Sequence, residues 1–292
     1  MNTKLGLGTV QFGQAYGVSN TAGQTPAHEV AAVLREAHAR GIRVLDTAPL
    51  YGDSERVLGE AMAAEFQLVT KTPKFGDPGL TAREARARLR DTFERSLALL
   101  RVPRVGTVLF HDAADLAGPL GAELWSELAS LRDSGRIERI GVSVYDAAQL
   151  DRVLDAYPVQ AVQVPLNVLD QRLIRSGHLE RLRRAGVAVH CRSVFLQGLL
   201  VMDPDALSPH FARVRDHLKS FKAWSDERGL SRLQVALGFA LEVAGVDVVL
   251  CGVNDAAQLR EICAAAERRV PAAELARFAI DDVDVLNPAR WR

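Results

Sequence analysis

The chain has 292 residues, of which 48% are hydrophobic and 25% are charged, so it carries enough apolar residues for a full hydrophobic core. Its 36 basic and 36 acidic residues give a formal net charge of +0, which leaves no basic field to attract nucleic acid or an anionic membrane. We therefore expect neither of these as a partner.

No apolar run approaches the roughly 18 residues that a membrane span needs, and the first residues lack the apolar core of a signal peptide. The three cysteines, Cys191, Cys251 and Cys263, form no CxxC pair, which argues against a disulfide framework and against a thiolate zinc site. We expect a cytoplasmic protein with one domain over residues 1–292 and no bound metal.

Eight short, β-branched apolar segments recur along the chain, and a segment of helical periodicity follows each one. They lack the in-and-out alternation of a half-exposed sheet, which is typical of parallel strands covered on both faces. The predicted strands are residues 4–10, 42–46, 67–71, 105–110, 139–143, 159–164, 186–191 and 246–251.

The helical segments carry start signals, stop signals and apolar stripes. Residues 26–40 open with Pro26 at a first-turn position and end at Gly41. Residues 83–100 have one apolar stripe at helical spacing. The stripe consists of Leu89, Phe93, Leu97 and Leu100.

Strict alternation of strands and helices allows a closed eightfold barrel or an open doubly wound sheet. The glycine-rich start, Gly6-Leu7-Gly8, has Gln11 where a dinucleotide-binding GxGxxG motif needs its third glycine. We therefore predict an α/β protein with a (β/α)8 TIM-barrel fold. Residues 209–228 and 231–243 predict at least one extra helix between strands seven and eight, and a C-terminal tail follows the last unit.

Ionisable side chains stand at the ends of three successive predicted strands. Asp46 ends the second strand, Lys71 ends the third, and His111 directly follows the fourth. Tyr51 lies in the loop after Asp46, and Ser54 is placed to cap the next helix. Because the βα loops form one mouth of such a barrel, we expect Asp46, Tyr51, Lys71 and His111 to face it together. Taken singly, they have structural alternatives: an ion pair, a loop anchor and a capping histidine.

This set of groups suits carbonyl reduction. Hydride delivered to a carbonyl carbon leaves charge on the oxygen, which a nearby acid must quench. An ammonium next to a tyrosine lowers the phenol pKa from about 10, and a carboxylate paired with that ammonium keeps it charged. A neutral histidine orients the carbonyl by donating a hydrogen bond. No metal is needed for this chemistry.

The segments LDTAPLYGDSE, VTKT and LFHD resemble the aldo-keto reductases, and the resemblance runs from LGLGT at the start to the eighth βα unit. Asp46, Tyr51, Lys71 and His111 match the catalytic tetrad of that family in identity, order and spacing. The resemblance implies a barrel that interconverts aldehydes or ketones with alcohols using NADPH or NADH. It makes Tyr51 the general acid, Lys71 the group that tunes its pKa, and Asp46 the partner of Lys71. His111 would orient the carbonyl.

The resemblance also implies a cofactor site at the strand ends. Its members before strand eight are Thr9, Ser143, Gln163, Arg192, Ser193 and Phe195. Arg192 stands where the family usually has an aromatic residue under the nicotinamide, and Val144 stands where it has an Asn. The segment CGVNDAAQLREI resembles the adenosine-binding segment, with Gly252, Asn254, Gln258 and Glu261 in register.

The same segment bears on the choice of dinucleotide. No Lys or Arg directly follows Gly252 to meet a ribose 2′-phosphate, and Asp255 would repel one. Arg260 acts in the opposite direction, unless Glu261 holds its guanidinium. We predict weak discrimination between NADPH and NADH, or a preference for NADH, whereas NADPH is usual in the family.

Two other functions stay open. A Schiff-base lyase would use Lys71 as its nucleophile, although a paired Asp46 keeps the amine protonated. A cofactor-sensing or regulatory barrel would keep the fold without catalysis. For a reductase, an aromatic content of only 6% and a polar mouth favour a small-molecule carbonyl substrate such as a sugar or short hydroxyaldehyde. The predicted mouth residues are Gln11, Tyr16, Asn167 and Gln197. The sequence does not determine the oligomeric state.

Overall fold

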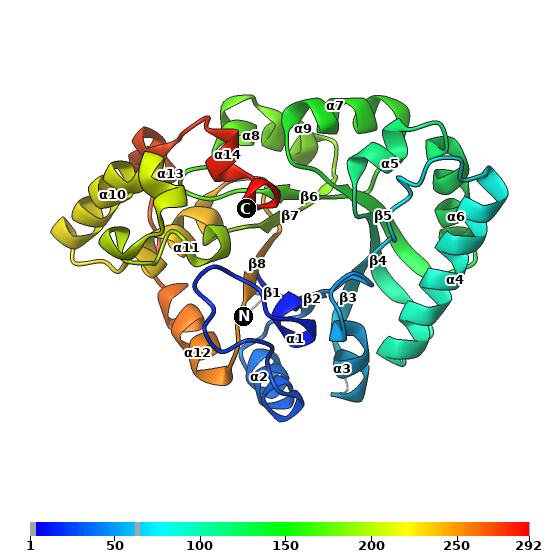
Figure 1. Ribbon diagram of the computed structural model, residues 1–292, viewed down its shortest axis with the longest axis horizontal. Coiled ribbons are helices and arrows are strands. Elements are labelled where there is room, and N and C mark those ends of the chain that lie inside the picture. The colour runs from blue at the N-terminus through cyan, green and yellow to red at the C-terminus, as the bar shows by residue number, and fades with distance from the viewer. Residues whose placement is uncertain (1–3, 62–64, 292) are drawn as a thin grey trace.

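Eight parallel strands close into a barrel in the computed structural model, which describes residues 4–61 and 65–291 (Figure 1). The strand order follows the sequence, and the last strand pairs with the first to complete the ring. The strands are β1 Leu5–Gly8, β2 Val44–Asp46, β3 Gln67–Lys71, β4 Val105–Phe110, β5 Ile137–Ser143, β6 Ala161–Pro165, β7 Ala188–Arg192 and β8 Val248–Gly252. The predicted TIM-barrel fold is confirmed.

Helices surround the ring of strands, as Figure 1 shows. They are α1 Val10–Gly13, α2 Ala27–Ala39, α3 Ser54–Glu60, α4 Ala82–Leu100, α5 Ala113–Ala117, α6 Gly121–Asp133, α7 Ala147–Ala156, α8 Arg172–Arg175, α9 His178–Arg184 and, after β8, α12 Ala256–Ala265. The predicted apolar stripe of α4 is buried along its whole length. Within the described ranges, no helix combines the length and the apolar character that crossing a membrane requires.

Several element boundaries differ by a few residues from the prediction, and two of these differences have clear local reasons. Pro26 precedes α2 with an extended ψ of 148°, so it stands at the N-cap position rather than in the first turn. The first strand stops at Gly8 because Val10 already begins the short helix α1. That helix brings its last residue, Gly13, close to the loop that follows β2.

The connection from β7 to β8 carries the extra helices α10 Arg215–Glu227 and α11 Arg232–Glu242, drawn in yellow tones in Figure 1. Short 3-10 turns precede them at Leu196–Gly198, Pro204–Ala206 and Pro209–Val214. The prediction of one helix over 209–228 is therefore wrong at its start. The 3-10 turn places side chains three residues apart on one side, so that Phe211 and Val214 are both buried.

The C-terminal tail folds back onto the loops that follow β6 and β7. It contains α13 Ala272–Leu275, a 3-10 turn at Ala276–Phe278, α14 Val283–Leu286 and a 3-10 turn at Pro288–Arg290. The amide of Ile280 donates to the carbonyl oxygen of Leu169 at 2.9 Å. The ring of Trp291 meets Phe211 edge-on at 4.8 Å, which attaches the tail to the insertion between β7 and β8.

Candidate active site

The ionisable side chains at the ends of three successive strands lie next to one another. Lys71 Nζ, at the end of β3, donates to Asp46 Oδ1 at 2.7 Å and to the carbonyl oxygen of Thr47 at 2.9 Å. The same ammonium lies 4.7 Å from the centroid of the Tyr51 ring. That ring meets the imidazole of His111 edge-on, with centroids 5.8 Å apart. The fold thus brings together the four side chains that we expected at one mouth.

Close packing of α1 fixes the loop that carries Tyr51. A Cβ on Gly13 would lie 1.7 Å from the Tyr51 carbonyl oxygen, so only glycine allows this approach. Gly52, the next residue of the loop, has a φ of 54° in the left-handed region that favours glycine. The amide of Asp53 donates to the Gly13 carbonyl oxygen at 3.3 Å. The two glycines therefore set where the phenol of Tyr51 stands.

Ser54 ties the same loop to the neighbouring strand. Its hydroxyl donates to the Thr9 carbonyl oxygen at 2.9 Å and accepts from the Thr47 hydroxyl at 3.0 Å. The prediction that Ser54 caps the helix is wrong, because Asp53 occupies the N-cap position and Ser54 is the first helical residue. The Thr9 hydroxyl donates to the Asp46 carbonyl oxygen at 2.9 Å, so it has no second proton to offer a ligand.

Burial and charge oppose each other at Tyr51 and Lys71. Burial raises the pKa of the Tyr51 phenol, and the adjacent Lys71 ammonium offsets this only in part. The ammonium acts to lower the phenol pKa, as expected, but the net pKa is raised because desolvation of the phenolate outweighs the attraction of the ammonium. Burial is the largest influence on the pKa of Lys71 and works against its charge, but Asp46 and Tyr51 together outweigh burial, so the pKa of Lys71 is raised. An enclosed, protonated amine is a poor nucleophile, which disfavours the Schiff-base alternative.

His111 is neutral at physiological pH. Burial lowers the pKa of its imidazole to about 3, and the positive charges of Lys71 and Lys74 act in the same direction. Its Nδ1 atom is buried and has no hydrogen-bond partner among the described residues. A neutral imidazole has one N–H, with which it can orient a carbonyl without acting as the proton source.

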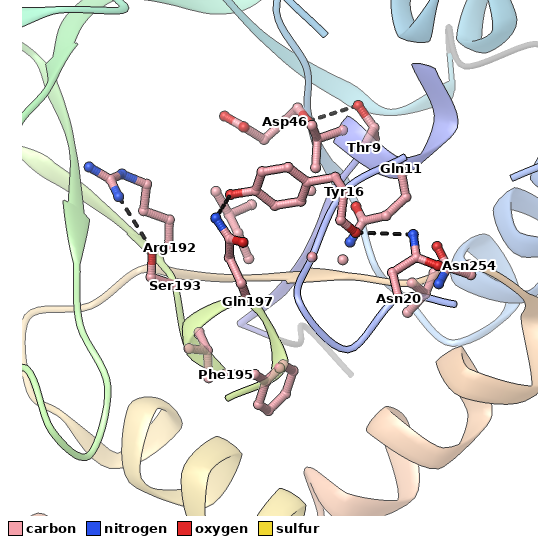
Figure 2. Close-up of a pocket in the computed structure, with 18 of the residues that line it drawn as sticks. Thr9, Gln11, Tyr16, Asn20, Asp46, Arg192, Ser193, Phe195, Gln197 and Asn254 are labelled. Atoms are coloured by element: carbon pink, nitrogen blue, oxygen red, sulfur yellow. Dashed lines mark hydrogen bonds between the residues drawn. The ribbon is translucent and has the colours of Figure 1, made fainter. Parts of the chain in front are cut away.

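A cavity of about 530 Å³ lies beside these groups, and Asp46, Tyr51 and His111 form part of its wall. Figure 2 shows this cavity, with Asp46 labelled among the residues that line it. Its volume falls within the range of small-molecule and cofactor sites. Every residue that the resemblance assigned to the cofactor also lies in this wall. These residues are Thr9, Ser143, Gln163, Arg192, Ser193, Phe195, Gly252, Asn254, Gln258 and Glu261.

One of these residues is already engaged by the catalytic candidates. Gln163 Nε2 donates to Asp46 Oδ2 at 2.7 Å, while Lys71 binds the other oxygen of the same carboxylate. The Gln163 amide oxygen is the atom left for a ligand. Gln163 therefore links the cofactor side of the cavity to the ion pair behind Tyr51.

Arg192, the last residue of β7, reaches over the end of β5. Its guanidinium carbon lies 4.2 Å from the centroid of the Tyr145 ring. The guanidinium donates to the Val144 carbonyl oxygen at 3.1 Å and to the Ser193 hydroxyl at 3.3 Å.

Sequence reasoning missed two residues of the cavity wall. One is Tyr145, although it lies two residues beyond the end of β5. Leu233 of α11 also lines the cavity, and no strand-end rule could have found it.

Two loops meet across the opening of the cavity. Figure 2 shows the Tyr16 hydroxyl accepting a hydrogen bond from Gln197 Nε2, at 3.2 Å. Ser193, Leu196 and Gln197 have positive φ values of 61°, 48° and 55°, which is unusual for residues with a side chain.

The prediction that Asn167 lies at the mouth is wrong. It is fully buried, and its amide nitrogen donates to the Ser193 carbonyl oxygen at 3.0 Å.

The segment after β8 forms the far end of the cavity. Asp255 caps α12 by accepting from the Gln258 amide at 2.7 Å, and Gln258 Oε1 accepts from the Asn254 amide at 2.8 Å. Asn254 Oδ1 is buried and has no partner in the described part of the chain. Arg260 lies against Glu36 of α2, 3.8 Å away, and is not part of the cavity wall.

Comparison with known proteins identifies the family. The model of the aldo/keto reductase family matches residues 4–282. L-galactose dehydrogenase of Arabidopsis thaliana is 27% identical over 279 residues, covering 90% of this chain and 86% of that protein. NADH-specific methylglyoxal reductase of Escherichia coli is 28% identical over 184 residues, covering 56% of each. The structure of aldo-keto reductase AKR11C1 from Bacillus halodurans, in its holo form, has a TM-score of 0.77 at 21% identity and covers 98% of this chain and 95% of that chain. Since the family model spans nearly the whole sequence, the chain belongs to the aldo/keto reductase family.

Proposed function

We propose that the protein is an NAD(P)H-dependent reductase that converts an aldehyde or ketone into an alcohol, with Tyr51 as the general acid. The family consists of NAD(P)H-dependent carbonyl reductases, which supports the reaction class. One observation carries the proposal for this chain. Tyr51 and His111 share a cavity wall with the candidate cofactor residues, and the Lys71–Asp46 pair lies beside Tyr51.

The residues present fit a nicotinamide dinucleotide. The buried oxygens Gln11 Oε1 and Asn254 Oδ1 have no partner among the described residues and would accept hydrogen bonds from a ligand. Gly252 presents no side chain to the cavity. A Cβ there would lie 2.4 Å from Gln11 Nε2, so a larger residue would displace the Gln11 amide. When bound, the dinucleotide supplies the hydride.

Each part of the dinucleotide has candidate partners. Ser143 and Gln163 would hold the nicotinamide amide, Arg192 would face the ring, and the backbone of residues 193–196 would hold the pyrophosphate. Phe195 and Gly252 would pack beside the cofactor, and Thr9 would shape the floor of the site. Asn254, Gln258 and Glu261 would bind the adenosine.

Side chains of the protein would donate the proton and stabilise the charges that form during its transfer. His111, held neutral, would donate a hydrogen bond to the carbonyl oxygen and orient it. Tyr51 would then transfer its hydroxyl proton to that oxygen as negative charge develops there. The Lys71 ammonium would stabilise the phenolate that remains, and Asp46 would keep Lys71 charged. The contact between Tyr16 and Gln197 would limit the access of water during this step.

The substrate side of the cavity supports a small, polar carbonyl compound such as a sugar or short hydroxyaldehyde. Tyr16, Ser19, Asn20 and Gln197 line the wall near its opening and offer hydroxyl and amide groups. No tryptophan occurs in the described wall, and three of its aromatic side chains are tyrosines, which carry a polar hydroxyl group. Hydroxyl groups on the substrate would find partners here.

For the dinucleotide, we propose NADH, or NADH and NADPH with little discrimination. Arg260 is turned towards Glu36, and the Asp255 carboxylate, which caps α12, would repel a 2′-phosphate bound near it. The Escherichia coli relative is named as NADH-specific, which supports the same choice.

Titration of the protein with NADH and NADPH by fluorescence, followed by a panel of carbonyl compounds, tests the proposal. We expect nucleotide binding and turnover of hydroxylated aldehydes. Tight nucleotide binding without any turnover would favour the cofactor-sensing alternative. If bulky aryl ketones exceed every hydroxylated aldehyde in kcat/KM, the proposed substrate class is wrong.

A further inference from the structure

A guanidinium that has no anionic partner among the described residues flanks the reaction centre. Arg192 lines the same cavity as Tyr51 and His111, yet its contacts among the described residues are a carbonyl oxygen, a hydroxyl and an aromatic ring. Many other arginines of the chain form ion pairs with carboxylates, as Arg172 does with Asp170 at 2.7 Å. The charge of Arg192 is therefore not neutralised within the site.

Arg192 is close enough to act electrostatically on the reacting groups. Burial is the largest influence on the pKa of Tyr16, Tyr51 and His111, and the charge of Arg192 acts on all three in addition. It opposes the raised pKa of both phenols and lowers that of His111 further. These three side chains and Arg192 line one cavity, so any charge that forms beside the carbonyl forms within reach of Arg192.

A charge does form there during the proposed reaction. Hydride transfer carries one hydrogen and two electrons from the dihydronicotinamide ring to the carbonyl carbon, and Tyr51 supplies a proton to the oxygen. The carbonyl is reduced and the dinucleotide is oxidised, so its ring changes from neutral to positively charged. A fixed guanidinium repels the oxidised ring and leaves the reduced ring unaffected.

The expected size of this repulsion is large. At an effective dielectric constant of about 20, two unit charges about 6–8 Å apart change an equilibrium constant by roughly thirty- to a hundredfold. Salt screens part of the effect at an open site, so a factor of about ten is a conservative expectation.

We propose that Arg192 makes this site discriminate between the two redox states of its dinucleotide. It weakens the binding of the oxidised form relative to the reduced form, so it favours loading of the site with the reduced dinucleotide and release of the oxidised dinucleotide after turnover. This inference rests on the proposed function, because it requires a nicotinamide dinucleotide in the cavity.

Dissociation constants measured without substrate test the inference independently of turnover. NADH and NAD⁺, and likewise NADPH and NADP⁺, are titrated against the wild type, Arg192→Met and Arg192→Lys at fixed ionic strength. Arg139→Met is the matched control. Arg139 is an exposed residue of β5 that lines a separate cavity at the opposite end of the barrel, so this change also removes one guanidinium but at a distance from the candidate active site.

We expect the ratio of the NAD⁺ to the NADH dissociation constant to fall at least tenfold in Arg192→Met. It should change less than threefold in Arg192→Lys and in Arg139→Met. High salt should lower the ratio in the wild type and leave it constant in Arg192→Met, which provides a test even if one variant folds poorly.

An unchanged ratio in Arg192→Met, with both nucleotides still bound, would overturn the inference and leave the proposed function intact. Failure of the wild type to bind any of the four nucleotides would overturn the proposed function, and the inference with it.

Discussion

Tyr51 and Lys71 set the pH dependence that we expect for the reaction. A general acid must carry its proton, and burial raises the pKa of Tyr51, so the kcat of reduction should fall only when the pH rises through a value above about 10. With a pKa of about 3, His111 contributes no change in the neutral range. Lys71→Met removes the charge that opposes the raised phenol pKa, so this variant should lose activity. The fall of its kcat at high pH (the basic limb of the pH profile) should move to higher pH.

The measurement is kcat between about pH 5 and 11 for the wild type, Lys71→Met and Lys74→Met. Lys74 acts on His111 but has no resolved influence on Tyr51, so its variant should keep the wild-type limb. A basic limb near pH 7 in the wild type, or a limb that Lys71→Met does not move, would contradict this account of the phenol.

At the scale of elements, the contact between α1 and the loop before α3 positions Tyr51. Gly13→Ala would place a methyl group 1.7 Å from the Tyr51 carbonyl oxygen and 2.5 Å from the Ser54 amide, so α1 or the loop must move. We expect a loss of roughly 1–3 kcal/mol in stability, as for other overpacked sites, together with a lower kcat. Thermal unfolding and kinetics on Gly13→Ala and Gly76→Ala test this, since a Cβ on Gly76 meets nothing within 4 Å. Wild-type kcat in Gly13→Ala would show that α1 does not position Tyr51.

Glu55 is a buried carboxylate that joins three elements. Its oxygens accept from the Thr70 hydroxyl of β3 at 2.6 Å and from the Ser96 hydroxyl of α4 at 3.0 Å. Burial raises its pKa, so the folded protein binds this proton more tightly than the unfolded chain. The contribution of Glu55 to stability therefore falls as the pH rises from its ordinary pKa through the raised value. Glu55→Gln abolishes this dependence.

Urea unfolding at about pH 4.5 and pH 8 should show that Glu55→Gln gains stability relative to the wild type at the higher pH. Glu84→Gln is the matched control. Glu84 belongs to the capping box of α4, and hydrogen bonds from Thr81 lower its pKa, so its variant should lose stability relative to the wild type as the pH rises. The same sign in both variants would contradict the assignment of Glu55.

Some features of these elements were readable in the sequence and others were not. The stripe Leu89, Phe93, Leu97 and Leu100 predicted the buried face of α4 because helical spacing alone decides which side chains share a face. Ser54 was misread because a serine beside a helix start is usually a cap, whereas here tertiary contacts with Thr9 and Thr47 use its hydroxyl. The raised pKa of Tyr51 was missed because spacing shows which charges are near a phenol but not how deeply it is buried.

At the scale of the whole molecule, the alternation of strands and helices was enough to predict the barrel, since the ends of parallel strands must meet at one mouth. That rule also placed Asp46, Lys71 and His111 near one another. The covering of the mouth was harder to foresee. The 3-10 turns before α10 and the presence of Leu233 in the cavity wall both depend on packing between segments far apart in sequence.

The balanced charge of the molecule makes the choice of dinucleotide depend on local groups. A charged hydrogen bond contributes about 1.5–3 kcal/mol, so a missing cation near the 2′-phosphate removes roughly ten- to a hundredfold of any NADPH preference. We expect the NADH and NADPH dissociation constants to agree within about tenfold, or to favour NADH, at fixed ionic strength. Arg260→Ala should leave their ratio unchanged, because Arg260 faces Glu36. An NADPH advantage above about a hundredfold would show that other cations bind the phosphate.

The central claim is that Tyr51 gives the proton in a hydride-transfer reaction, and single-turnover reduction by prebound NADH in the wild type and Tyr51→Phe tests it most directly. General acid catalysis contributes on the order of 10²–10⁴-fold, so Tyr51→Phe should lose at least that factor in the rate of hydride transfer. Its dissociation constant for NADH should stay within about threefold of the wild type. A Tyr51→Phe variant that transfers hydride at the wild-type rate would contradict the account.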